Sequence, residues 1–135
     1  IVPGGIGKKT ISHDAIDKKE YFIHMSGNAT FKVAVKRMAE VSKEALDFNK
    51  LSVKDIGLVI PHQANRRIID AVTDKLGIPK EKVFMNIEKY GNTSSASIPI
   101  AMHEASKTGL IKPGSLTLLV VVGAGLTWGA ALIRW

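Results

Sequence analysis

IGLVIPHQAN, residues 56–65, is the stretch that decides the fold. Residues 56–60 are an apolar run of the length expected for a buried strand. Pro61 and His62 then mark a sharp turn, and the amphipathic, basic segment that follows predicts a helix over residues 63–76. In open α/β sheets, ligands bind where a strand ends beside the start of a helix. His62 is therefore the first candidate site residue.

A second stretch of the same kind lies further along the chain. Residues 82–87 are predicted to form a short strand, and residues 88–93 the turn that follows it. Gly91 and Asn92 lie in that turn, where a glycine indicates positive φ or a close backbone approach. If the two strands are neighbours, His62 and Asn92 belong to one site.

The remaining segments complete an α/β pattern. Apolar residues at spacings of three and four predict helices over residues 29–48 and 94–107, the first with Asn28 as N-cap. Residues 116–122 and 126–135 are predicted strands, and the tight turn between them makes the last one antiparallel. The predicted fold is therefore a mixed, mostly parallel sheet with helices packed on it. Residues 25–135 are assigned to one domain, and residues 1–24, which show no regular period, to an irregular connecting loop.

Composition restricts the function classes. The chain has 135 residues, no cysteine and a net charge of +7. Disulfides and thiolate metal sites are therefore excluded, no His or carboxylate spacing indicates a metal site, and no apolar run is long enough to span a membrane. The positive charge favours an acidic partner. Nucleic acid is disfavoured, because aromatic residues are only 6% of the chain and no recognisable nucleic-acid-binding module occurs. The cytoplasm is the expected location.

The candidate residues suit the stabilisation of negative charge. A histidine near a helix N-terminus is expected to be neutral and able to donate a hydrogen bond to an oxyanion, and the amide of Asn92 is a second donor. The turn at residues 123–125 could leave backbone amides free for a ligand. Each feature also has a purely structural explanation: a histidine that packs at a turn, an asparagine that shapes one, and a tight glycine turn. No attacking group accompanies them.

Three motifs resemble those of β-ketoacyl-acyl-carrier-protein synthase III. They are PHQAN at residues 61–65, YGNTS at 90–94 and GAGLTWG at 123–129. The resemblance covers about residues 25–135 and implies the C-terminal half of a thiolase-type fold, so that a cysteine-bearing N-terminal half is missing. It implies that acyl-CoA is condensed with malonyl-acyl-carrier protein to initiate fatty acid biosynthesis. It also implies a homodimer, no cofactor beyond the CoA thioester substrate, and a chain that is inactive alone.

The resemblance also assigns roles to individual residues. His62 and Asn92 are implied as catalytic, and the backbone of Ala124 as part of an oxyanion hole. The residues implied to line the CoA or pantetheine channel are Gly27, Asn28, Phe31, Ala64 and Asn65. Lys32 and Arg67 are implied to dock the acidic carrier protein.

Two other functions are kept as alternatives. The chain could be a non-catalytic module that binds acyl-carrier protein or CoA, or part of a related thiolase-fold synthase of another pathway. A condensation assay distinguishes a catalytic half from a binding module, because only the catalytic half needs His62 and Asn92 for condensation.

Overall fold

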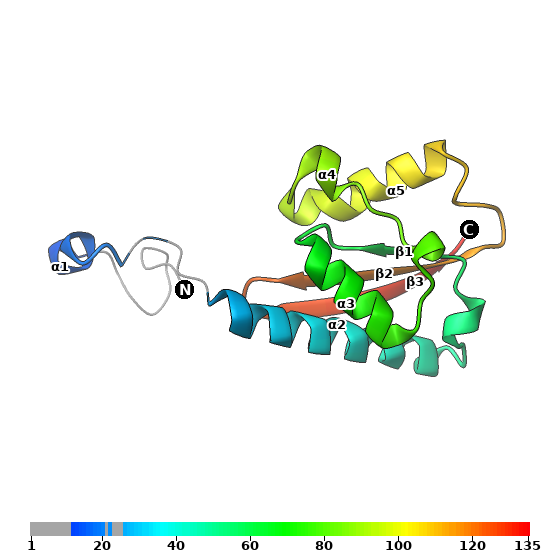
Figure 1. The fold of residues 1–135 in the computed structure, drawn as a ribbon, viewed down its shortest axis with the longest axis horizontal. Helices are drawn as coiled ribbons and strands as arrows, with labels where there is room; N and C mark the ends of the chain where they lie inside the picture. The colour runs from blue at the N-terminus through cyan, green and yellow to red at the C-terminus, as the bar shows by residue number, and fades with distance from the viewer. Residues whose placement is uncertain (1–11, 21, 23–25) are drawn as a thin grey trace. The chain divides into compact units, whose positions relative to one another are not determined.

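The computed structural model describes residues 12–20, 22 and 26–135 (Figure 1). The chain divides into two units, Ile1–Thr30 and Phe31–Trp135. The first unit contains α1 (His13–Asp17), which is capped by the Ser12 hydroxyl accepting the N–H of Ala15 at 3.1 Å. This helix lies within the segment expected to be irregular. The rest of that segment is partly outside the described residues, so the domain boundary at residue 25 stays a prediction.

The second unit is built on a mixed sheet of three strands in the order β1-β2-β3. They are β1 (Leu58–Pro61), β2 (Leu116–Gly123) and β3 (Thr127–Arg134). Strands β1 and β2 are parallel, with Pro61 opposite Val120, and β3 is antiparallel to β2. The predicted antiparallel last strand is confirmed.

Helices cover both faces of this sheet (Figure 1). On one face, α2 (Gly27–Phe48) and α3 (Arg66–Leu76) supply Met38, Leu46 and Val72, which pack against Val59 of β1 and Leu118 of β2. On the other face, α5 (Ser97–Lys107) packs against β1. Successive side chains of a strand point to opposite faces, so burial on both sides explains why β1 is apolar at every position.

The contact between α5 and β1 is made by small residues. Ser97, Ala101 and Ala105 form one buried stripe along α5, four residues apart. The two alanines pack against Leu58 and Ile60 of β1. Residues four apart lie on the same face of a helix, and such small side chains allow the helix to approach the strand closely. The N-terminal end of this stripe is Ser97.

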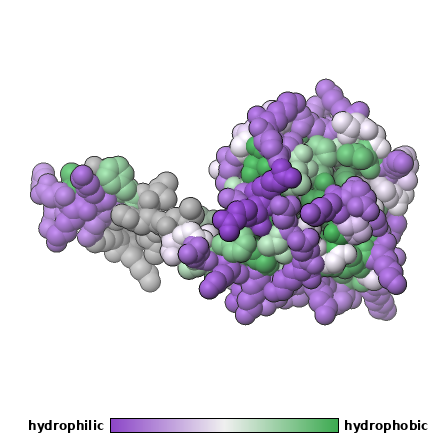
Figure 2. Space-filling view, viewed as in Figure 1, coloured by the Kyte–Doolittle hydropathy of each residue, from purple (hydrophilic) through white to green (hydrophobic). Residues whose placement is uncertain are grey.

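Strand β3 is the least covered part of the sheet. Its residues are partly buried or exposed and none is fully buried; Trp128 in the strand and Trp135 just after it are each 42% exposed. Arg37 of α2 covers the ring of Trp128, with its guanidinium carbon 4.7 Å from the ring centroid. Figure 2 shows patches of hydrophobic residues among hydrophilic ones on one face of the molecule.

Besides α1, four expectations about the elements are wrong, one of them the helix predicted from residue 94, which begins at Ser97 after a 3₁₀ turn. Residues 82–87 are not a strand: a single bridge joins Val83 to Val59, and the short helix α4 (Ile87–Tyr90) follows. Asn28 is not an N-cap, because α2 begins at Gly27. The helix predicted to begin at Gln63 begins at Arg66, with Asn65 as its N-cap. Short 3₁₀ turns at Val53–Asp55, Lys80–Lys82 and Ser94–Ala96 complete the described structure.

Substitution of Leu118 tests whether the sheet lies at the centre of the hydrophobic core. Its side chain is fully buried in the middle of β2, whereas Leu110 is 46% exposed. We expect Leu118→Ala to lower the free energy of unfolding by about 3 kcal/mol, because it removes buried apolar contacts and leaves a cavity. Leu110→Ala is the matched control and should cost less than about 1 kcal/mol. Urea denaturation measures both, and equal losses would contradict this arrangement.

Candidate active site

His62 is positioned by the parallel pairing of β1 with β2. Its backbone N–H donates to the carbonyl of Val120 at 2.8 Å, which extends the strand ladder by one residue. Because side chains alternate along a strand, His62 points to the same face as Ile60, the face covered by α5. The His62 ring is therefore held at the carboxyl end of β1, beside the start of α5.

The ring of His62 has one bonded and one open nitrogen. Nδ1 lies 2.5 Å from the hydroxyl oxygen of Ser97, the first residue of α5. Within the described residues, Nε2 has no hydrogen-bond partner. The ring is partly buried, and burial lowers the pKa of His62 below its usual value of 6.5. At neutral pH the ring is a neutral imidazole.

The lowered pKa of His62 has a different physical cause from the one expected. From the sequence, we expected the positive end of a helix dipole to keep His62 neutral. In the structure α3 begins at Arg66, after the N-cap Asn65, so His62 is not in that helix's first turn. The lowered pKa comes from removal of the ring from water.

Gln63 is a site residue that the sequence did not single out as functional. Its side chain is buried and donates from Nε2 to the carbonyl of Pro61 at 2.7 Å and to that of Phe84 at 3.4 Å. Its Oε1 accepts the backbone N–H of Asn86 at 3.0 Å. The side-chain amide thus bonds like a further backbone unit, and it links the end of β1 to the segment where a strand was predicted.

Asn92 lies in the loop between α4 and the 3₁₀ turn Ser94–Ala96. Its side-chain oxygen accepts the backbone N–H of Ser94 at 2.9 Å, which orients the amide. Its side-chain nitrogen has no partner among the described residues, and no hydrogen bond joins Asn92 to His62 there. The contact with His62 in this region is made instead by Ser97, five residues after Asn92 in the chain.

Ala124 occupies the turn between β2 and β3. It follows the end of β2 at Gly123, just as His62 follows the end of the neighbouring parallel strand β1. Its carbonyl accepts the Thr127 hydroxyl at 3.4 Å, and its backbone N–H has no partner in the described part of the chain. An exposed backbone amide at this end of the sheet is available to a ligand.

The other predicted site residues belong to different units: Gly27 and Asn28 to the first unit, and the rest to the second. Arg67 lies over the ring of Phe31, with its guanidinium carbon 5.6 Å from the centroid, so the structure brings these two together. Asn65 caps α3 by accepting the N–H of Arg67 at 2.9 Å, and Ala64 is partly buried beside it. Lys32 is exposed in the same unit. Gly27 and Asn28 belong to the first unit, at the start of α2.

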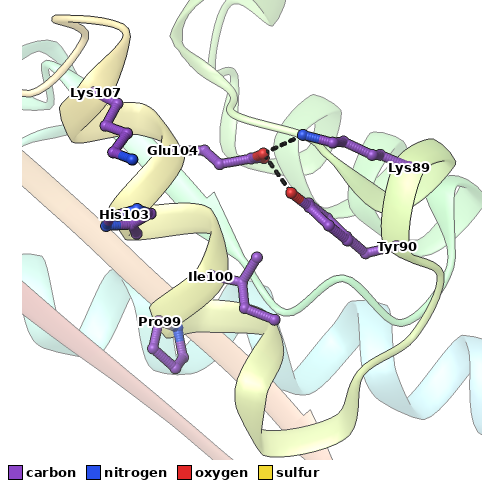
Figure 3. Close-up of a pocket in the computed structure, with 7 residues that line it drawn as sticks. All are labelled: Lys89, Tyr90, Pro99, Ile100, His103, Glu104 and Lys107. Atoms are coloured by element: carbon purple, nitrogen blue, oxygen red, sulfur yellow. Dashed lines mark hydrogen bonds and ion pairs between the residues drawn. The ribbon is translucent and has the colours of Figure 1, made fainter.

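Glu104 of α5 holds the segment that leads to Asn92 (Figure 3). Its carboxylate accepts hydrogen bonds from Asn86 at 2.8 Å, from Lys89 at 2.6 Å and from the Tyr90 hydroxyl at 2.6 Å. These bonds lower the pKa of Glu104 from 4.5 to about 2, and they raise the pKa of Lys89 above its usual value. The tyrosine of the YGN motif therefore has a structural partner.

A surface pocket of about 590 Å³ lies beside Glu104 (Figure 3). It is lined by residues of α4 and α5: Lys89, Tyr90, Pro99, Ile100, His103, Glu104 and Lys107. His62, Asn92 and Ala124 are not among them, so this pocket is separate from the candidate site.

Two kinds of site are not found in the described residues. No group of three or more His, Asp or Glu side chains there could hold a metal ion. No helix in those ranges is both long and apolar enough to cross a membrane.

The model of the 3-oxoacyl-[acyl-carrier-protein] synthase III C-terminal family matches residues 46–135. The chain belongs to this synthase III family. The synthase III of Aquifex aeolicus is 58% identical over 114 residues, which are 84% of this chain and 37% of that protein. The Campylobacter fetus synthase III is 50% identical over 135 residues, all of this chain and 41% of that protein.

Solved structures agree with this family assignment. The crystal structure of the A. aeolicus synthase III matches 85% of this chain and 37% of that chain, with a TM-score of 0.83 and 57% identity. The Pseudomonas aeruginosa synthase III matches 93% of this chain and 39% of that chain, with a TM-score of 0.83 and 37% identity. The fold is thiolase-like. The chain spans about two fifths of the length of these synthase III relatives.

The buried Gln63 bonds generate a prediction about stability. Gln63→Ala leaves the N–H of Asn86 and the carbonyls of Pro61 and Phe84 without their side-chain partner. We expect the free energy of unfolding to fall by about 2–4 kcal/mol, as for buried polar groups left unpaired. Asn49→Ala also removes a bond to a carbonyl, but an exposed one, and should cost about 0.5 kcal/mol. Urea denaturation measures the free energy of unfolding of both variants. An unchanged free energy of unfolding for Gln63→Ala would contradict the prediction.

Glu104 generates a prediction about pH. Its pKa is lower in the folded chain, so its stabilisation is present above about pH 4.5 and is lost as the pH falls towards 2. Glu104→Gln should therefore weaken the fold at neutral pH and reduce the loss of stability between these two pH values. Glu81→Gln, at an exposed position, should leave the profile unchanged. Thermal unfolding against pH measures this, and parallel profiles for all three proteins would rule the role out.

Proposed function

We propose that this chain is the C-terminal catalytic half of a 3-oxoacyl-acyl-carrier-protein synthase III, and that it works in the first condensation of fatty acid biosynthesis. The observation that carries the proposal is the state of His62. It is a neutral, partly buried imidazole with one nitrogen bonded and the other open, at the carboxyl end of a sheet strand. Such a group suits the donation of a hydrogen bond to developing negative charge.

The proposed reaction is a decarboxylative Claisen condensation. A cysteine thiolate attacks the carbonyl of acyl-CoA, and the CoA thiolate leaves. Malonyl-acyl-carrier protein then loses CO₂, and its bonding electrons form a thioester enolate. The enolate carbon attacks the acyl-cysteine carbonyl, a C–C bond forms, and the cysteine thiolate is expelled.

His62 and Asn92 act on the decarboxylation step. The Nε2–H of His62 and the side-chain amide of Asn92 donate to the enolate oxygen, on which negative charge develops as CO₂ departs. The bond between the Asn92 oxygen and the N–H of Ser94 supports this role, because it leaves the amide nitrogen as the free end. The backbone N–H of Ala124 donates to the oxyanion formed at the acyl-cysteine carbonyl.

The substrate arm and the carrier protein are assigned to residues of two segments of the chain, 27–32 and 64–67. Gly27, Asn28, Phe31, Ala64 and Asn65 line the pantetheine channel in this proposal, and Lys32 and Arg67 receive the carrier protein. The stacking of Arg67 over Phe31 supports a shared position for the channel and its mouth. The net charge of +7 would attract an acidic carrier protein and accelerate its encounter.

The nucleophile must come from outside this chain, which contains no cysteine. We therefore propose that it is inactive alone and acts with a cysteine-bearing N-terminal half, in a cytoplasmic homodimer that needs no cofactor. The absent cysteine also favours the second candidate, a non-catalytic module that binds acyl-carrier protein or CoA. A synthase of another pathway with the same fold would use the same donors on a different substrate.

Condensation in the assembled enzyme tests these roles. The chain is combined with a cysteine-bearing N-terminal half of a synthase III, and product formation from acyl-CoA and malonyl-acyl-carrier protein is measured. We expect His62→Ala and Asn92→Ala each to lower kcat by about 10²–10³, the usual cost of one oxyanion donor. His103→Ala, which removes an exposed histidine of α5, is the matched control and should leave kcat unchanged.

Two outcomes would contradict the proposal. Full activity of His62→Ala or Asn92→Ala removes their assigned roles. Absence of condensation with any matching half, together with retained binding of carrier protein, favours the binding module.

A further inference from the structure

Ser97 makes the contact that determines how His62 can act. Its hydroxyl oxygen lies 2.5 Å from Nδ1 of His62, and its side chain is buried, with the residue only 2% exposed. It begins the small-residue stripe of α5, whose other members Ala101 and Ala105 pack against β1. The close approach of helix and strand therefore places this hydroxyl against the imidazole.

A second contact orients the hydroxyl. The backbone N–H of Gln63 points to the Ser97 oxygen at 3.4 Å. A backbone N–H can only donate, so the Ser97 oxygen is the acceptor in this contact. In the part of the chain that the structure describes, the one other group within hydrogen-bond distance of the Ser97 hydroxyl is Nδ1 of His62, so Nδ1 is the one group there that could accept its proton.

We propose that Ser97 is a positioning residue that donates its hydroxyl proton to Nδ1 and thereby fixes His62 in the tautomer with its proton on Nε2. In a neutral imidazole one nitrogen carries the proton and the other accepts. An accepting Nδ1 leaves the proton on Nε2, the open nitrogen. The low pKa of His62 supports a neutral ring with two distinct nitrogens.

The consequence for catalysis rests on the proposed function. An Nε2–H aimed away from Ser97 is a donor, whereas the other tautomer would present a lone pair to the enolate oxygen and repel it. Ser97 therefore acts through His62 and needs no contact with substrate. The tautomer itself can be measured without substrate, so the test does not depend on whether the chain catalyses condensation.

Nitrogen NMR of the histidine-labelled full chain tests the tautomer. At a pH where the rings are neutral, protonated and unprotonated ring nitrogens have well-separated ¹⁵N shifts. We expect His62 to show Nε2 protonated and Nδ1 unprotonated with the shift of a hydrogen-bond acceptor. Exposed His103 serves as the reference ring in the same spectrum. A His62 that carries its proton on Nδ1, or matches the His103 pattern, overturns the proposal.

Two variants separate Ser97 from its surroundings. Ser97→Ala should abolish the hydrogen-bond shift of Nδ1 and bring in a fraction of the other tautomer. Ser95→Ala makes the same change at an exposed position of the preceding turn and should alter neither. If Ser97→Ala does not fold, Ser97→Cys keeps the size with a weaker donor and should reduce the Nδ1 shift. An unchanged shift in the folded variant overturns the proposal.

Kinetics of the assembled enzyme then tests the effect on catalysis. We expect Ser97→Ala to lower kcat roughly 3- to 10-fold with KM unchanged, the factor represented by one neutral hydrogen bond. Ser97→Cys, which keeps the size of the side chain with a weaker donor, should give a kcat between those of Ser97→Ala and the unchanged chain. An altered tautomer with unchanged kcat would overturn the catalytic consequence and leave the tautomer assignment intact. An unchanged tautomer with lowered kcat would overturn the positioning role.

Discussion

The parallel pairing of β1 with β2 is the constraint on which the other features depend. It continues one residue past β1, where the N–H of His62 donates to the carbonyl of Val120 at 2.8 Å. A parallel pair needs cover on both faces, which explains α2 and α3 on one side and α5 on the other. It also brings the carboxyl ends of two strands together, so His62 and Ala124 belong to the same end of the sheet. The pairing of β1 with β2 therefore determines both the packing of the core and the position of the candidate site.

Two polar links of different kinds hold the segment that leads to Asn92. Gln63 forms buried, neutral hydrogen bonds to residues 84 and 86, so its contribution depends on the absence of water rather than on pH. Glu104 forms charged bonds to Asn86, Lys89 and Tyr90, where water and salt weaken the interaction. Asn86 takes part in both links, through its backbone and its side chain. The loop of Asn92 is therefore attached both to β1 and to α5.

Much of the fold could be predicted from the sequence, because its main signals are local. The apolar runs of β1 and β2, the turn before β3 and the spacing of α2 all have recognisable periods. The misassigned strand at residues 82–87 is apolar like a strand, but it forms only a single bridge to β1, and the Gln63 side chain bonds to residues 84 and 86 next to it, which no local pattern reports. The contact of Ser97 with His62 joins residues 35 positions apart. The sequence did contain an indication of this contact. Ser97, Ala101 and Ala105 are small residues spaced four apart, which indicates the face of α5 that packs against a strand.

The difference between local signals and tertiary contacts also explains why the cause of the lowered His62 pKa could not be predicted from the sequence. Sequence proximity suggested a helix dipole, but Asn65 already caps α3 and the ring lies outside its first turn. Burial of the ring is a tertiary effect, which no local pattern reports. The hydrogen bonding is asymmetric: Nδ1 contacts the Ser97 hydroxyl, and Nε2 has no partner among the described residues. Under the proposed function, a donor whose orientation is already fixed by contacts within this chain needs no rearrangement when negative charge develops beside it.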